Sequence, residues 1–135
     1  MSRVLALDYG EARCGVAVSD PTGTLATPLE AIEQPGSRRG LQRVARVVRK
    51  QRADLVVVGL PLTLAGEEGG QARLTREWTA RLSEAISVPV ELHDERLTTR
   101  QAEQTGGGAD ADSRAAAHLL ESWLARTPRT ERMSS

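Results

Sequence analysis

The stretch RVLALDYGEARCGVAVSD, residues 3–20, decides the fold because it places two apolar runs close together in the chain. Residues 3–8 (RVLALD) and 14–19 (CGVAVS) each have the length and composition of a buried strand. About five residues separate them, whereas a parallel pair would need a crossover of about a dozen. We therefore expect an antiparallel hairpin, followed by a turn at residues 20–23 (DPTG).

Helical and strand patterns alternate after this hairpin. A third short strand is expected within residues 25–32, broken or shifted by Pro28. The later elements are, in order, a helix at 37–51 with Leu41, Val44 and Val48 inward, a strand at 54–59, a helix at 71–86 with Leu74, Trp78, Leu82 and Ala85 inward, a strand at 88–93, a short helix at 98–104, a glycine break at 106–108 and a last helix at 113–126.

The order β-β-β-α-β-α-β-α-α predicts an α/β fold with a mixed five-stranded sheet and helices on both faces. Right-handed crossovers make the first, fourth and fifth strands parallel, and the second and third continue the sheet as an antiparallel edge. A chain of 135 residues fits one core, so we expect a single domain at residues 1–126. Residues 127–135 are expected to form a disordered tail.

Charge and composition narrow the class of protein. Eighteen basic and eighteen acidic residues cancel, so no global field indicates a nucleic-acid partner. Residues 38–52 nevertheless carry seven basic residues and no acid, which is typical either of a solvated face or, less often, of a nucleic-acid contact. Cys14 is the single cysteine, which excludes an intrachain disulfide framework. The sequence shows no signal peptide or membrane span, so we expect a cytoplasmic protein with no membrane partner.

Carboxylates follow the strands that should be parallel. Asp8 ends the first strand, and Asp94 and Glu95 end the fifth, so they should meet at one edge of the sheet, where ligands bind in open α/β folds. Asp112 stands at the start of the last helix, close to its inward stripe. Clustered carboxylates repel one another unless a hard cation binds them. We therefore expect Asp8, Glu95 and Asp112 to hold Mg²⁺ or Mn²⁺, with two ions serving phosphodiester hydrolysis.

Neighbouring residues suit contacts with a nucleic acid. A guanidinium pairs well with phosphate, and a glycine lets a substrate approach the backbone closely. The candidate nucleic-acid contacts are Gly10, Arg13, Arg96 and Arg100.

Four stretches of the sequence also resemble one family. LALDYGEARCGVAVSD, VVVGLPL, HDERLTT and DSRAAAHLLESWL stand in the order of the motifs of the YqgF family, also called RuvX-like, and the resemblance runs from residue 4 to 124. Its members are described as pre-16S ribosomal RNA nucleases and as Holliday junction resolvases. The resemblance implies a ribonuclease H-like fold. It also implies that Asp8, Glu95 and Asp112 are the catalytic, metal-binding carboxylates.

The resemblance has one departure, and each carboxylate has a simpler interpretation. Family members carry a longer and often basic segment before the last aspartate, whereas residues 105–111 (TGGGADA) lack Arg and Lys. Asp110 therefore competes with Asp112 as the third ligand. Asp8 could instead belong to a hairpin turn, Glu95 to a surface ion pair and Asp112 to a helix cap.

We expect a divalent-metal-dependent endonuclease acting on structured nucleic acid. The preferred substrate is the 5′ end of pre-16S ribosomal RNA, and four-way DNA junctions come second. A monomer or a weak homodimer is expected. Two alternatives are a nucleotide-binding protein, since the first stretch also resembles the phosphate loop of the actin and sugar kinase superfold, and a nucleic-acid-binding module that has lost catalysis.

Overall fold

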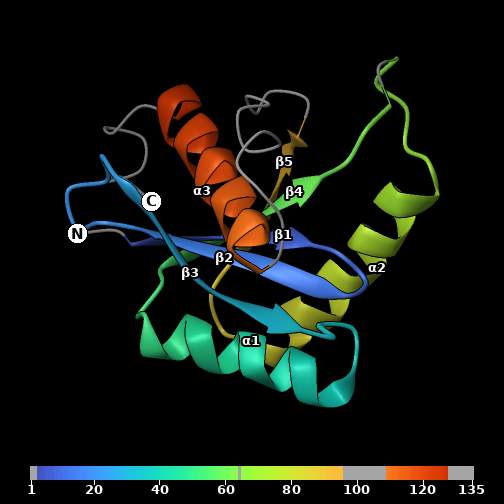
Figure 1. Cartoon of the computed structure of the whole chain (residues 1–135), viewed down its shortest axis with the longest axis horizontal. Coiled ribbons are helices and arrows are strands. Elements are labelled where there is room, and N and C mark those ends of the chain that lie inside the picture. The colour runs from blue at the N-terminus through green and yellow to red at the C-terminus, as the bar shows by residue number, and fades with distance from the viewer. Residues whose placement is uncertain (1–2, 64, 96–108, 128–135) are drawn as a thin grey trace.

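The computed structural model describes residues 3–63, 65–95 and 109–127. Side chains are described for these residues except Ala109 and Asp110. Figure 1 shows the elements in chain order: β1 (Val4–Tyr9), β2 (Arg13–Ser19), β3 (Ala26–Glu33), α1 (Arg38–Lys50), β4 (Leu55–Leu60), α2 (Gly70–Ala85), β5 (Val90–Asp94) and α3 (Ala109–Arg126).

The five strands form one sheet in the order β3-β2-β1-β4-β5. The pairs β1–β4 and β4–β5 are parallel, while β1–β2 and β2–β3 are antiparallel. Pro28 lies within β3 without breaking it, since β3 is an edge strand and one side of its backbone needs no ladder partner. The hairpin, the mixed sheet and the parallel direction of the first, fourth and fifth strands are confirmed.

Helices cover both faces of the sheet, as predicted. Leu5 and Leu7 of β1 point into a core closed by α1 and α2. Val4 and Ala6, which alternate with them, point to the opposite face and pack against α3. In Figure 1, α1 and α2 lie on one side of the strands and α3 lies across the other.

The turn after β2 is held by one aspartate. The carboxylate of Asp20 accepts hydrogen bonds from the backbone N–H groups of Thr24 and Leu25, at 2.8 and 2.9 Å. It also accepts one from the hydroxyl of Thr22. These donors hold the pKa of Asp20 down to about 2, with the Thr22 hydroxyl contributing most. The predicted turn at 20–23 is therefore confirmed.

Ser37 begins α1 by capping it. The Ser37 hydroxyl accepts a hydrogen bond from the N–H of Gly40 at 3.0 Å. Val44 and Val48 are buried, and Leu41 packs half-buried against the same core, as the spacing predicted.

The buried face of α2 differs from the predicted one. Leu74 is 40% exposed and Ala85 is exposed, so the prediction that they point inward is wrong. The buried positions include Thr75 and Thr79, whose hydroxyls donate to the carbonyls of Gln71 and Thr75, one turn earlier. A threonine satisfied in this way can be buried, which rotates the inward face away from Leu74. The remaining inward residues of α2 are Ala72, Trp78 and Leu82.

The last helix starts earlier than predicted. It begins at Ala109 rather than at residue 113, so Asp112 lies inside its first turn and is not a cap. The predicted helix at 98–104, the glycine break at 106–108 and the tail beyond Thr127 fall outside the described residues. No helix in the described part of the chain is long and apolar enough to cross a membrane.

Candidate active site

The sheet brings two of the predicted carboxylates to the same edge and the same face. Asp8 is the fifth residue of β1, on the face that Val4 and Ala6 present to α3. Glu95 directly follows β5. The strand β4 lies between β1 and β5, so the two carboxylates come from strands separated by one neighbour.

Gly59 of β4 makes room for these two carboxylates to meet. A Cβ atom built on Gly59 would lie 2.5 Å from Oε1 of Glu95 and 2.8 Å from its Cγ. The Glu95 side chain therefore occupies the space that a side chain of residue 59 would fill. From there it hydrogen-bonds the carboxyl group of Asp8. In the sequence Gly59 is only the last residue of the predicted strand at 54–59, and nothing there indicates this role.

The Asp8 carboxyl group holds a proton unusually strongly. Burial contributes most to the rise of its pKa from 3.8 to about 8, followed by the hydrogen bond and charge of Glu95 and then the charge of Asp112. All of these causes act in one direction, and no basic side chain in the described part of the chain offsets them. Asp8 is thus a half-buried carboxylate whose charged form lacks a counterion among the residues that the structure describes.

Asp112 approaches this pair from α3, on the far side of Asp8 from Glu95. Asp8 pairs with Gly15 in the β1–β2 ladder. A Cβ on Gly15 would lie 1.9 Å from the backbone carbonyl oxygen of Asp112, so only a glycine lets α3 come this close. The Asp112 carboxylate accepts a hydrogen bond from Nε of Arg13 at 2.8 Å and forms a salt bridge with it.

An irregularity in β2 anchors the beginning of α3. The register between β2 and β3 shifts between Cys14 and Val16, which is the pattern of a β-bulge. The N–H of Val16 donates to the hydroxyl of Ser113, which is 2% exposed, at 3.3 Å. This bond fixes Asp112 beside β2. The sequence holds a weak signal for it, the serine that follows the predicted ligand.

Tyr9 supports the edge of the sheet from the other face. Its ring stacks on Trp78, with centroids 4.7 Å apart and an interplanar angle of 25°. The indole Nε1 of Trp78 donates to the carbonyl of Pro35 at 2.9 Å, just before α1. These contacts tie the end of β1 to the middle of α2 and to the segment before α1, so the strand that carries Asp8 is held from this face as well.

The donor set suits a hard cation, but the three carboxylates are not arranged as one ligand group. Across residues 3–63, 65–95 and 109–127, no cluster of three or more His, Cys, Asp or Glu side chains has the geometry to hold a metal ion. Asp8 and Glu95 are in contact, and a divalent cation would replace the proton between them. Asp112 is instead paired with Arg13. The structure therefore brings two of the three candidates together and leaves the third beside them.

The candidate nucleic-acid contacts are described in part. Arg13 is 40% exposed, and its guanidinium is engaged with Asp112. A Cβ on Gly10 would lie 2.8 Å from the carbonyl oxygen of Arg13, so closure of the hairpin already favours a glycine there. Arg96 and Arg100 lie outside the described residues, as does the side chain of the competing Asp110.

Relatives and solved structures agree with this fold. A Chloroflexus aurantiacus protein named "Putative pre-16S rRNA nuclease" is 46% identical over 101 residues, which cover 75% of this chain and 66% of that protein. A Sulfurihydrogenibium protein of the same name is 40% identical and covers 93% of this chain and 92% of its own length.

Among solved structures, Thermus thermophilus RuvC in complex with a Holliday junction substrate matches with a TM-score of 0.60 at 18% identity, over 93% of this chain and 96% of that one. The fowlpox virus Holliday junction resolvase matches with a TM-score of 0.53 at 12% identity, over 91% and 98%. At these identities the likeness concerns the fold, which is the ribonuclease H-like fold of RuvC.

A family model described as "RuvX: Holliday junction resolvase" matches residues 2–126, nearly the whole chain. With relatives at 40% and 46% identity on top of the shared fold, the conclusion is direct: the chain belongs to the RuvX family.

Proposed function

We propose that the chain is a divalent-metal-dependent endonuclease that matures the 5′ end of pre-16S ribosomal RNA. The observation that carries this proposal is the Asp8–Glu95 pair, two half-buried carboxylates that have no counterion among the described residues, at the edge of the sheet where such folds bind ligands. Buried carboxylates whose pKa is raised by their neighbours are typical of functional sites. Two relatives whose names refer to pre-16S rRNA support the choice of substrate.

In this proposal Asp8 and Glu95 hold Mg²⁺ or Mn²⁺, and Asp112 joins them. When bound, two such ions activate a water and stabilise the leaving oxygen of a phosphodiester. The chain's own residues position that chemistry. Gly59 leaves space for Glu95, and the bond from Val16 to Ser113 keeps Asp112 close to Asp8.

Arg13 pairs with Asp112 in the structure, and in this proposal it also binds the substrate phosphate. It neutralises Asp112 in the structure described, at 2.8 Å. A phosphate arriving at the site offers the guanidinium a competing partner with bidentate geometry. Transfer of Arg13 from Asp112 to the phosphate would free the third carboxylate as the substrate binds. Arg96, Arg100 and Gly10 remain further candidate contacts.

A four-way DNA junction is the second candidate substrate. The family is described as a Holliday junction resolvase, and the matching RuvC structure contains a Holliday junction substrate, which favours testing it. Paired cuts in a two-fold junction would need two copies of the chain, whereas processing one RNA end needs a single copy. We propose a cytoplasmic monomer or weak homodimer.

The test compares two Asp→Asn variants. Purified wild type, Asp8→Asn and Asp20→Asn are incubated with Mg²⁺ or Mn²⁺ and either a pre-16S RNA fragment or a four-way junction. We expect wild type and Asp20→Asn to cleave the RNA and Asp8→Asn to be inactive. Equal cleavage by Asp8→Asn would show that contaminating nuclease or another site is responsible.

A direct metal measurement separates catalysis from binding. We expect Mg²⁺ or Mn²⁺ to raise the Tm of wild type and to leave the Tm of Asp8→Asn unchanged, because Asp8 supplies the ligand whose charge most needs a cation. Nucleic-acid binding by both proteins, without cleavage and without a metal-dependent rise in Tm, would refute the nuclease proposal in favour of a non-catalytic binding module.

A further inference from the structure

Helix α1 carries a charged face that the proposed active site does not use. Between residues 38 and 52 there are seven basic residues and no acid, which leaves eleven basic against eighteen acidic residues for the rest of the chain. The neutral total therefore hides a strong segregation of charge. All seven are exposed in the structure: Arg38, Arg39, Arg43, Arg46, Arg49, Lys50 and Arg52.

Four of these cations form a line, which we call the basic stripe: Arg39, Arg43, Arg46 and Lys50. At 100° per residue they fall within about 60° of one another, and their centre lies about 150° around the helix from that of the buried Val44 and Val48. Spacings of three and four residues correspond to about 4.5 and 6 Å along the helix. The stripe thus presents cations at a spacing that lets each meet a different phosphate.

Contacts within the described part of the fold do not explain the stripe. Among the residues that the structure describes, no carboxylate forms a salt bridge with any of the seven cations. Like charges three and four residues apart repel one another, and Arg38 and Arg39 stand at the positive end of the helix dipole, with no acid in the first turn. Burial of α1 would be served equally well by neutral side chains at these exposed positions.

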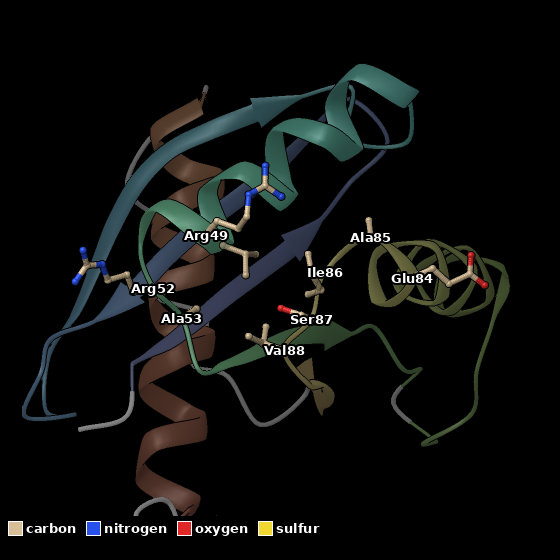
Figure 2. Close-up of a pocket in the computed structure, with 9 residues that line it drawn as sticks. Arg49, Arg52, Ala53, Glu84, Ala85, Ile86, Ser87 and Val88 are labelled. Carbon is tan, nitrogen blue, oxygen red and sulfur yellow. The ribbon is translucent and has the colours of Figure 1, made fainter.

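A cavity at the end of α1 does not account for them either. It is open to solvent and has a volume of about 400 Å³ between the carboxyl ends of α1 and α2, with Ala53, Ile86 and Val88 in its wall. Arg49 and Arg52 also line it, and Figure 2 shows the Arg52 guanidinium pointing away from Ile86 and Val88 and the Glu84 carboxylate lying apart from both guanidinium groups. Neither arginine belongs to the basic stripe, so this cavity does not explain the stripe.

The stripe begins at the edge of the sheet that carries the carboxylates. Gly36, two residues before α1, lies beside the hydroxyl of Tyr9, since a Cβ there would be 3.4 Å from it. Tyr9 directly follows Asp8 in the strand. From this edge α1 runs across the face of the sheet opposite α3, away from the carboxylate pair. A nucleic acid held at the active site and long enough to pass this edge would meet the stripe.

We propose that the basic stripe of α1 is a second RNA-binding surface, which holds the phosphate backbone of a helical segment of the substrate beyond the cleavage point. This rests on the proposed nuclease function and names the feature of the substrate that the chain grips. Arginine suits the task because it binds phosphate oxygens bidentately and stays charged. A lipid surface fits less well, because the apolar side of α1 is buried in the core and has no side chains to insert.

The test measures binding apart from cleavage. The variant Arg39→Gln/Arg43→Gln/Arg46→Gln is made in the full chain with Asp8→Asn, in EDTA, so that no cleavage occurs. The matched control, Arg73→Gln/Arg76→Gln/Arg126→Gln, removes three exposed positive charges from α2 and α3 instead. The probe is a fluorescent RNA duplex of about two helical turns, followed by anisotropy across a range of salt concentrations. Far-UV circular dichroism checks that α1 remains helical.

We expect the stripe variant to bind the duplex about tenfold to a hundredfold more weakly, with the slope of log K against log salt reduced by about 2–3. The control should retain the wild-type slope. Equal loss in both variants, or no loss in the stripe variant, would overturn the proposal. The proposal would also be overturned, in favour of a membrane contact, if the stripe variant lost binding to vesicles of phosphatidylserine and phosphatidylcholine but still bound RNA as wild type does.

A second measurement separates this proposal from the nuclease proposal. With Asp8 intact and metal present, the stripe variant should raise KM for a pre-16S fragment with a flanking helix by about tenfold and leave kcat unchanged. On a short RNA without that helix, stripe variant and wild type should behave alike. A fall in kcat on both RNAs would contradict a remote binding role. If wild type cleaves neither RNA, the nuclease proposal fails, while the duplex-binding result still decides the role of the stripe.

Discussion

Two aspartates at opposite ends of the same hairpin illustrate two uses of a carboxylate. Asp20 follows β2 and accepts hydrogen bonds from Thr22, Thr24 and Leu25, which lower its pKa to about 2. Asp8, near the other end of β1, is half-buried beside further carboxylates, and its pKa rises to about 8. One end of the hairpin stabilises the negative charge, while the other end resists it.

The difference shows where a charge that the proposed function needs lowers the stability of the fold. At Asp20 ionisation and folding support each other, because the charged carboxylate is the better hydrogen-bond acceptor. At Asp8 the ionised form is the less stable one, so this carboxylate opposes folding at neutral pH unless a cation joins it. A group that the fold holds at such a cost is a candidate for chemistry, and the following changes break or sharpen the contrast.

The largest effect is expected from Asp8→Asn on activity. Asparagine keeps the shape of the side chain but removes the charge that the proposed metal requires. Cleavage of the pre-16S fragment should fall by about a thousandfold or more in single-turnover assays. If Asp8→Asn kept more than a tenth of wild-type activity, Asp8 would not be a catalytic metal ligand.

Gly15→Ala should damage the structure most. The new Cβ would lie 1.9 Å from the carbonyl oxygen of Asp112, so α3 must shift away from β2. Urea denaturation should show a loss of about 2–4 kcal/mol in the free energy of unfolding. Gly70→Ala, whose Cβ meets nothing within 4 Å, is the control and should be nearly neutral. Equal stability of the two variants would contradict the close approach of α3 to Gly15 of β2.

Gly59→Ala should affect activity rather than stability. Its Cβ meets the flexible end of Glu95 at 2.5 Å, so that side chain can swing away from Asp8 at little cost. We expect kcat to fall by about tenfold to a hundredfold and the free energy of unfolding to change by less than about 1 kcal/mol. Crystallography of the variant should show Glu95 displaced. Unchanged kcat with Glu95 still in contact with Asp8 would contradict the role given to Gly59.

Asp20→Asn should have the smallest effect. It should lower the stability of the protein, whereas Asp8→Asn should raise it at neutral pH. Asp20→Asn weakens the bonds to the turn, so Tm should fall by about 2–5 °C while cleavage stays at the wild-type level. Because the folded-state pKa is lowered, the stabilisation from Asp20 is present above pH 4 and is lost as pH falls towards 2. The gap in Tm between wild type and Asp20→Asn should therefore close in acid. A gap that widens in acid would mean that the turn prefers the protonated carboxyl group.

Connection lengths made the sheet predictable from the sequence. The short gap before β2 allows only an antiparallel pair, and the helical crossovers make β4 and β5 parallel to β1. The same reasoning placed Asp8 and Glu95 at one edge, and the structure brings them into contact. Their identity as metal ligands stays a prediction.

Other features depend on facts that a local pattern does not contain. The prediction that Leu74 points inward was wrong because it relied on hydrophobicity alone. Thr75 is polar, but its hydroxyl donates to a carbonyl of its own helix, so Thr75 can be buried in place of Leu74. The salt bridge of Arg13 with Asp112 joins residues 99 positions apart, so no spacing rule predicts it. The tasks of Gly15 and Gly59 follow from what lies across from them in the folded chain.

The central claim is that the fold opposes the charge of Asp8. The most direct test is the free energy of unfolding of wild type and Asp8→Asn, measured in EDTA by urea denaturation from pH 4 to pH 9. A folded-state pKa raised from 3.8 to about 8 means that the native state binds the proton more tightly than the unfolded state, so wild type should lose stability as pH rises through this window. Asp8→Asn should not show that loss, and by pH 8 it should be the more stable protein by about 2–4 kcal/mol. An Asp8→Asn protein that is less stable than wild type, or a difference that does not change with pH, would contradict the account.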